Sequence, residues 1–246
     1  MTRPMPIYVL WSAARSRSTA FFRSILERPD LLALHEPLEG LAYIGPLDIA
    51  SRHFVTPASL IEWLLDEADE PVFLKETMSP LVVDLVLGHP RFLAEARHAF
   101  LIRRPEEIAA SFLALEGDLR IDNTGVKALS ELHTAVVDAG GQPVVVDSDD
   151  LVHHPAATMQ AYCEAVGLPF MADAMAWEAG VRPEWERTAR WHVDVSASTG
   201  FIRPTDRDRH GLSAHPDVRR FAERHGPYYE RIWAERLRID PGNGHA

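Results

Sequence analysis

Residues 7–37 read IYVLWSAARSRSTAFFRSILERPDLLALHEP, an apolar run, a polar loop and an amphipathic segment in direct succession. The run at 7–11 is short enough to be a buried strand of a parallel sheet. Apolar residues over 21–26 predict one face of a packed helix, which Ser18 or Thr19 can cap. Free N–H groups at a helix start, together with Arg15 and Arg17, favour an anion. The sequence therefore predicts a phosphate or sulfate site in this loop.

The rest of the chain repeats the same order of elements. Short apolar strands are expected at 31–34, 71–74, 98–102 and 143–146, and helices at 57–67, 79–87, 106–115, 123–139, 155–166 and 217–237. Residues 38–56 have no clean period and are interpreted as a loop or lid, and 177–211 as largely irregular. Alternating strands and helices predict an α/β fold, a three-layer P-loop NTPase-like architecture with a central parallel sheet flanked by helices.

Length and composition limit the class of protein. The 246 residues, 46% hydrophobic and 25% charged, predict one globular domain over 1–246, with 240–246 as a frayed tail. A net charge of −11 counts against nucleic acid as a partner. A single cysteine, Cys163, and no signal peptide or membrane-spanning run predict a cytoplasmic protein without a membrane partner. The oligomeric state stays open.

The loop lacks the glycines and the lysine of a GxxxxGK[ST] nucleotide loop. It resembles the 5′-phosphosulfate loop of PAPS-dependent sulfotransferases, P-[KR]-x-G-[ST]-[ST], with Arg15 at the basic position and Ser18 and Thr19 as the hydroxyl pair. Ala14 replaces the usual proline and Arg17 the usual glycine. Because glycine tolerates a positive φ and arginine does not, either this loop stays in ordinary backbone space or the chain belongs to a divergent branch.

A second motif, LIRRPEEIAASF at 101–112, places Arg103 at a strand end and Ser111 on the next helix. Taken alone, it is an ordinary strand end with a solvated arginine, but it resembles the 3′-phosphate motif of the same family. The stretches 144–170, VVVDSDDLVHHPAATMQAYCEAVGLPF, and 225–233, HGPYYERIW, resemble later family blocks. The family role of the first is structural, so Asp149 and Asp150 are assigned no chemistry.

The resemblance implies PAPS as donor, PAP as product and no metal. It assigns the 5′-phosphosulfate to Arg15, Ser16, Arg17, Ser18 and Thr19, and the 3′-phosphate to Arg103 and Ser111, with Arg207 and Arg209 in a late basic loop.

Glu36 is the candidate general base, since HEP at 35–37 resembles the glutamate of some bacterial and Golgi-type members. His35 is its rival, and because neighbouring strand side chains face opposite ways, only one of the two is expected in the cleft. Lys75, one of only two lysines in the chain, ends a strand where the family often has a catalytic lysine. Its charge, with Arg15, could stabilise the transferring group.

The sequence therefore predicts a PAPS-dependent sulfotransferase that acts on a hydroxyl or amine of a small-molecule acceptor. A small-molecule kinase with an altered loop is the first alternative, and a non-catalytic nucleotide-binding protein is the second. The absent GK[ST] pair and the Arg103–Ser111 pair count against the kinase, and Glu36 and Lys75 count against the binding protein. The acceptor is not identified.

Overall fold

The computed structural model describes residues 5–117, 119, 124–203, 212 and 214–240, and its centre is a five-stranded parallel sheet in the order β2-β5-β1-β6-β7. The strands are β1 (Ile7–Ser12), β2 (Leu32–His35), β5 (Val72–Thr77), β6 (Arg97–Ile102) and β7 (Val144–Asp147). The predicted α/β fold is confirmed, and all five predicted strands lie within a few residues of their expected positions. Every residue of β1 is buried, because this central strand has a neighbour on each edge and helices over both faces.

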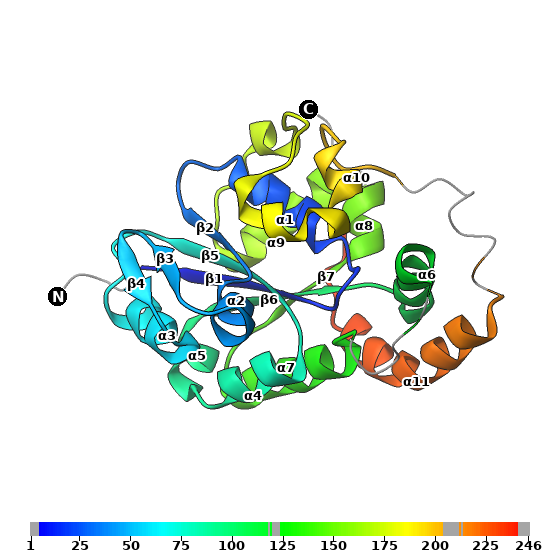
Figure 1. The fold of residues 1–246 in the computed structure, drawn as a ribbon, viewed down its shortest axis with the longest axis horizontal. Coiled ribbons are helices and arrows are strands. Elements are labelled where there is room, and N and C mark those ends of the chain that lie inside the picture. Colours follow the sequence, from blue (N-terminus) through cyan, green and yellow to red (C-terminus); the bar gives the residue numbers. More distant parts are fainter. Residues whose placement is uncertain (1–4, 118, 120–123, 204–211, 213, 241–246) are drawn as a thin grey trace.

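Helices cover both faces of the sheet (Figure 1). One face carries α1 (Ser18–Leu26), α8 (Ser148–His153), α9 (Pro155–Val166) and α10 (Val193–Ser196). The other carries α2 (Pro37–Tyr43), α3 (Pro57–Asp66), α4 (Pro80–Leu87), α5 (Pro90–Glu95), α7 (Val126–Asp138) and α11 (Pro216–Trp233). Alternate residues of β1 enter two separate cores, Val9 and Trp11 on one face, Tyr8 and Leu10 on the other. The period of two thus builds both layers. Beyond the edge of the sheet, α6 (Pro105–Glu116) packs against α11.

Proline and a hydroxyl residue define several helix starts. The Oγ1 of Thr56 accepts from Ser59 N (3.2 Å) before Pro57, and the Oγ of Ser79 accepts from Val82 N (3.3 Å) before Pro80. Proline suits the first helical position because the N–H that it lacks would have no helical partner there. These caps fix where α3 and α4 begin, as the sequence predicts.

The predicted loop or lid at 38–56 has regular secondary structure, so that prediction was wrong. Residues 38–56 form α2 and a hairpin of β3 (Leu47–Ile49) and β4 (Arg52–Phe54). The hairpin turn places Ala50 and Ser51 at φ 49° and 61°, positions usually filled by glycine or asparagine, so the usual turn signal is absent. Within 177–203, a 3₁₀ segment η2 (Pro183–Trp191) leads into α10. The acidic stretch after β7 forms the short helix α8.

No described helix combines the length and apolar character needed to cross a bilayer.

Candidate functional site

The candidate site lies at the carboxyl edge of the sheet, where the loop after β1 enters α1. Because the strands are parallel, their ends gather at one edge, and the residues that follow β1, β2, β5 and β6 come together there. This geometry joins segments from four distant parts of the sequence.

The loop after β1 does not stay in ordinary backbone space, so the first of the two alternatives for the Arg17 substitution is ruled out. Arg15 and Arg17 have φ of 63° and 64°, both in the left-handed region. Arg17, not Ser18 or Thr19, is the N-cap of α1, and no side chain caps that helix, so the capping prediction was wrong. Left-handed non-glycine residues cost of the order of 1–3 kcal/mol each, and surrounding contacts must hold them in place.

Two carboxylates hold Arg17. Its guanidinium donates to Asp149 Oδ1 (2.8 Å), Glu107 Oε2 (3.0 Å) and the carbonyl of Ser148 (3.1 Å). Burial alone would raise the pKa of Asp149, but hydrogen bonds from Arg17 and Arg104 lower it to about 2. Asp149 therefore stays charged and supports the strained loop, a role that the sequence left unassigned. The Arg17 guanidinium itself is engaged by protein groups.

Several donors of the loop have no protein acceptor. Among the described residues, the N–H groups of residues 15–19 donate to no backbone carbonyl, and the first that does is that of Ala20, which donates to Arg17 O (3.1 Å). The buried hydroxyl of Ser16 has no hydrogen-bond partner in the described structure either. A buried unpaired hydroxyl is costly, and an anion oxygen would satisfy it. This loop can accept a phosphate or a sulfate group.

The structure brings Arg103 and Ser111 together with the loop. Arg15 donates through Nε to Ser111 Oγ (3.0 Å), and Arg103 donates through Nη1 to the carbonyl of Arg15 (2.6 Å). Burial lowers the pKa of Arg103 to about 10, so the side chain is still charged at neutral pH. The two motifs thus form one cationic cluster at neighbouring strand ends. Arg207 and Arg209 lie outside the described residues.

Glu36 and Lys75 form an ion pair at the ends of β2 and β5. Lys75 is 2% exposed and also donates to Thr77 Oγ1 (2.9 Å), whose hydroxyl donates to Glu36 Oε1 (2.5 Å). Burial alone would raise the pKa of Glu36, but the Lys75 ammonium and these hydrogen bonds lower it to about 2. Both predicted residues lie at the site, and each is the ion-pair partner of the other. Thr77 was not predicted.

His35 and Glu36 lie next to each other at the junction, where the His35 side chain is 4% exposed and the Glu36 side chain 20%. Their side chains approach to 3.8 Å (Nδ1 to Oε2), because β2 ends at His35 and Glu36 turns away at φ 50°. Strand alternation therefore does not reach Glu36. Burial, with Lys75 nearby, lowers the pKa of His35 to about 3, and its Nε2 is buried without a partner in the described structure.

A cover segment, residues 183–196 of η2 and α10, lies against the loop and was not predicted. The carbonyl of Trp191 accepts from Arg15 Nη1 (2.9 Å). Thr19 Oγ1 and His192 Nδ1 share a hydrogen bond of 2.9 Å, and His192 Nε2 lies 3.2 Å from Thr188 Oγ1. Burial, with Lys75 nearby, lowers the pKa of His192 to about 4. Two of the predicted anion ligands thus contact this segment.

Two further carboxyl groups lie at the start of α2. Glu76, on the opposite face of β5 from Lys75, is fully buried and accepts from Leu38 N (2.7 Å) and Glu39 N (3.4 Å). Glu39 is half-buried, and in the described structure its side chain makes no hydrogen bond or ion pair. The only sequence signal for Glu39 is its position three residues after Glu36.

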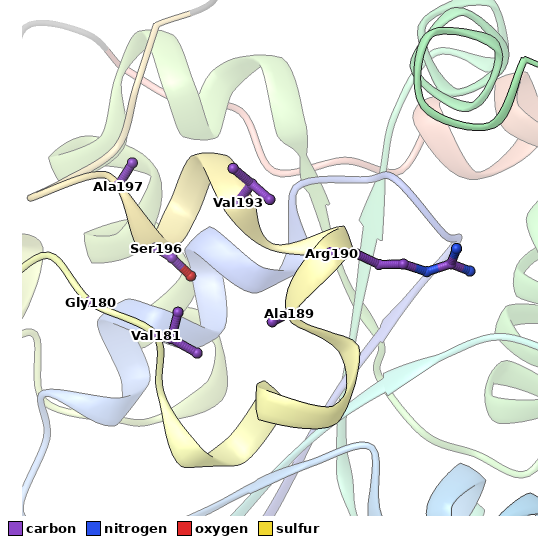
Figure 2. Close-up of a pocket in the computed structure, with 7 residues that line it drawn as sticks. All are labelled: Gly180, Val181, Ala189, Arg190, Val193, Ser196 and Ala197. Carbon is purple, nitrogen blue, oxygen red and sulfur yellow. The ribbon is translucent and has the colours of Figure 1, made fainter.

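An open hollow lies elsewhere, beside the cover segment. Figure 2 shows it bordered by Val181, Val193 and small neighbours, while Arg190 points away from the other labelled residues. Its volume is about 450 Å³, and none of the predicted site residues lines it. It therefore contributes nothing to the loop or to the Glu36–Lys75 pair.

A cationic, hydroxyl-rich loop between the central strand and its helix, joined by an arginine–serine pair that follows the neighbouring strand, defines an α/β protein with a P-loop-like fold. More specifically, the chain belongs to the sulfotransferase domain family, which it matches over residues 5–220.

Two curated relatives match the chain in sequence, and one solved structure shares its fold. Branched-chain-amino-acid aminotransferase-like protein 2 of Arabidopsis thaliana is 27% identical over 208 residues, 81% of this chain and 37% of that protein. Protein 1 of the same name and organism is 26% identical over 230 residues, 89% and 40% of the two chains. This chain thus spans about two fifths of those relatives. The sulfotransferase domain from the curacin biosynthetic pathway aligns with a TM-score of 0.50 at 14% identity, covering 98% and 94% of the two chains.

Proposed function

We propose that this protein transfers a sulfuryl group from PAPS to a hydroxyl or amine of a small-molecule acceptor. The observation that carries the proposal is the cluster of Arg15, Arg103 and Ser111, because it joins the two predicted phosphate motifs through direct hydrogen bonds at 2.6 and 3.0 Å. Membership of the sulfotransferase domain family supports the reaction class.

The loop is suited to the sulfated phosphate of the donor. Free N–H groups of residues 15–19 and the unpaired hydroxyl of Ser16 supply hydrogen bonds, and Ser18 and Thr19 supply further hydroxyls at the start of α1. Arg17 takes part through the loop conformation, since its guanidinium is held by carboxylates. Arg103 and Ser111 would hold the 3′-phosphate through charge-assisted bonds.

The residues around β2 and β5 would carry the transfer. The acceptor loses its proton to a carboxylate at the junction of β2 and α2, the region where the sequence predicts Glu36. The Lys75 ammonium and the Arg15 guanidinium stabilise negative charge on the transferring group, in a site where protein surrounds them. Positioning of donor and acceptor for in-line attack supplies the remaining acceleration.

Nucleotide binding tests the proposal without any acceptor. PAP should bind far more tightly than AMP, and Arg103→Ala should remove most of the difference. A charge-assisted hydrogen bond is worth roughly 1.5–3 kcal/mol, so we expect at least a tenfold loss of PAP affinity in calorimetry. Arg91→Ala, which removes an exposed arginine from α5, is the matched control. Equal affinity of the wild type for PAP and AMP would refute the 3′-phosphate assignment, and a preference for ATP over PAP would favour the kinase alternative.

A further inference from the structure

We propose that Glu39, three residues beyond Glu36, is the carboxylate that takes the proton from the acceptor during transfer. This inference rests on the function proposed above. Glu39 takes over only the role of general base from Glu36. Glu36 becomes a positioning residue that holds Lys75.

The start of α2 places Glu39 beside Glu36. Glu36 is the N-cap of α2 and Glu39 lies in its first turn, so the two residues share one side of the helix start. Glu39 N donates to Glu76 Oε2 (3.4 Å), which fixes this turn against the end of β5. The Glu39 side chain is partly open to solvent, and no protein donor within the described residues occupies its carboxylate. It is therefore available to a hydroxyl or an amine.

The other titratable side chains at this edge of the sheet are hydrogen-bonded to protein groups or buried. Glu36 accepts from Lys75 and Thr77, and proton uptake would break that pair. Both nitrogens of His192 face threonine hydroxyls, and His35 is buried among aromatic rings. Both oxygens of Glu76 accept from backbone N–H groups at the start of α2. His35 Nε2 and Glu36 Oε2 make no hydrogen bond within the described residues, but the first is buried and the second belongs to the carboxylate that pairs with Lys75.

The charges around Glu39 suit a base near neutral pH. Burial and the Glu36 carboxylate raise the pKa of Glu39 to about 7, while Lys75 opposes them. Glu76 lies beneath the same turn. The other elements packed on α2 are β3, α3 and α4. Their acidic residues are exposed to solvent: Asp48, Glu62, Asp66 and Asp84. A base is most effective when its pKa lies near the working pH, whereas a carboxylate with a pKa of about 2 is a weak one.

The transfer step needs no reactant besides the donor, the acceptor and Glu39. An acceptor oxygen or nitrogen forms a bond to sulfur as its proton moves to a Glu39 oxygen. The bond from sulfur to the bridging phosphate oxygen breaks, and its electron pair leaves with PAP. Glu39 then returns the proton to solvent, which its partial exposure allows.

The test compares Glu39→Gln with Glu39→Asp and with Glu62→Gln, an exposed control on α3. PAP release from PAPS is followed from pH 5 to 9, with water and a panel of simple alcohols, phenols and amines as acceptors. We expect Glu39→Gln to lose at least about 100-fold in turnover and to lose the rise in rate near pH 7. Glu39→Asp should be slow but keep that rise, and Glu62→Gln should match the wild type.

PAP affinity, measured by calorimetry on the same variants, separates this inference from the proposed function. We expect it to change less than threefold in Glu39→Gln, because the carboxylate faces the acceptor side. Turnover of Glu39→Gln within threefold of wild type, or persistence of the rise near pH 7, would overturn the role of Glu39 while leaving PAPS use intact. A wild type that fails to bind PAP, or binds it and releases none from PAPS, would overturn the transfer reaction and this role with it.

Discussion

Replacing Glu36 by glutamine should destabilise the fold, because it removes the carboxylate charge that pairs with the buried Lys75 ammonium. The pKa of Glu36 falls from its ordinary 4.5 to about 2. At 1.36 kcal/mol per pKa unit, this corresponds to about 3 kcal/mol in favour of the folded state. Loss of one partner from a buried ion pair usually costs about 3–5 kcal/mol, in agreement. Because the folded pKa is depressed, this stabilisation is present above about pH 4.5 and is lost as the pH falls toward 2.

Urea unfolding measures this loss. With a slope of about 2–3 kcal/mol per molar urea, the midpoint of Glu36→Gln at pH 7 should fall by about 1–1.5 M. The difference from wild type should shrink as the pH is lowered from 4.5. Lys75→Met combined with Glu36→Gln should recover part of the stability, since no buried charge then lacks its partner. An unchanged midpoint at pH 7, or an equal loss at every pH, would refute the reasoning about the pair.

Three further outcomes are expected. Glu39→Gln should stabilise the fold at pH 8 by about 2 kcal/mol, after allowance for partial exposure, and should have no effect at pH 4. The reason is that the raised pKa of Glu39 makes the stability of the wild type fall as the pH rises from 4.5 to about 7. Urea unfolding curves at both pH values check the sign of this change. Gly125→Ala should lower the free energy of unfolding by about 3 kcal/mol in the same assay, because φ is +80° and the new Cβ would lie 2.4 Å from Met78 O. Gly226→Ala is the control: its new Cβ would lie in open space on α11, so it should be neutral or slightly stabilising. PAP release from PAPS should survive EDTA, since the loop has no carboxylate–hydroxyl pair to hold Mg²⁺ and no cluster of metal-ligating side chains occurs among the described residues. Activity that is lost in EDTA and recovered only on adding Mg²⁺ would contradict this.

The sequence was sufficient for the sheet because each strand is a separate apolar run with helical patterns between the runs. The edge of the sheet follows from that order, so the meeting of Arg15 with Arg103 and Ser111 could be anticipated. The roles of individual side chains within the site could not be read in the same way. Arg17 binds Asp149, 132 residues away, and nothing local to either residue indicates the pair.

The error at the end of β2 has a definite physical origin. The sequence predicts a loop or lid soon after the strand at 31–34, whereas Pro37 is the first residue of α2. Once a helix begins there, Glu36 leaves the strand period and Glu39 comes to lie beside it. The hairpin that follows was missed because Ala50 and Ser51 adopt positive φ without a glycine to announce the turn. Backbone strain held by tertiary contacts leaves no mark in the local sequence.

Trp191 and His192 have a kinetic consequence for any anion that binds the loop. The incoming group must exchange with the carbonyl of Trp191 at Arg15 and with the imidazole of His192 at Thr19. If these contacts must open before an anion enters, the cover segment has to move aside first, and the apparent affinity is weakened by the population of that open conformer. The observed association rate should consequently level off at high nucleotide concentration, at the opening rate of the cover segment. The same closure, once re-formed around a ligand, would slow escape, so residence time and equilibrium affinity can be set separately in this fold.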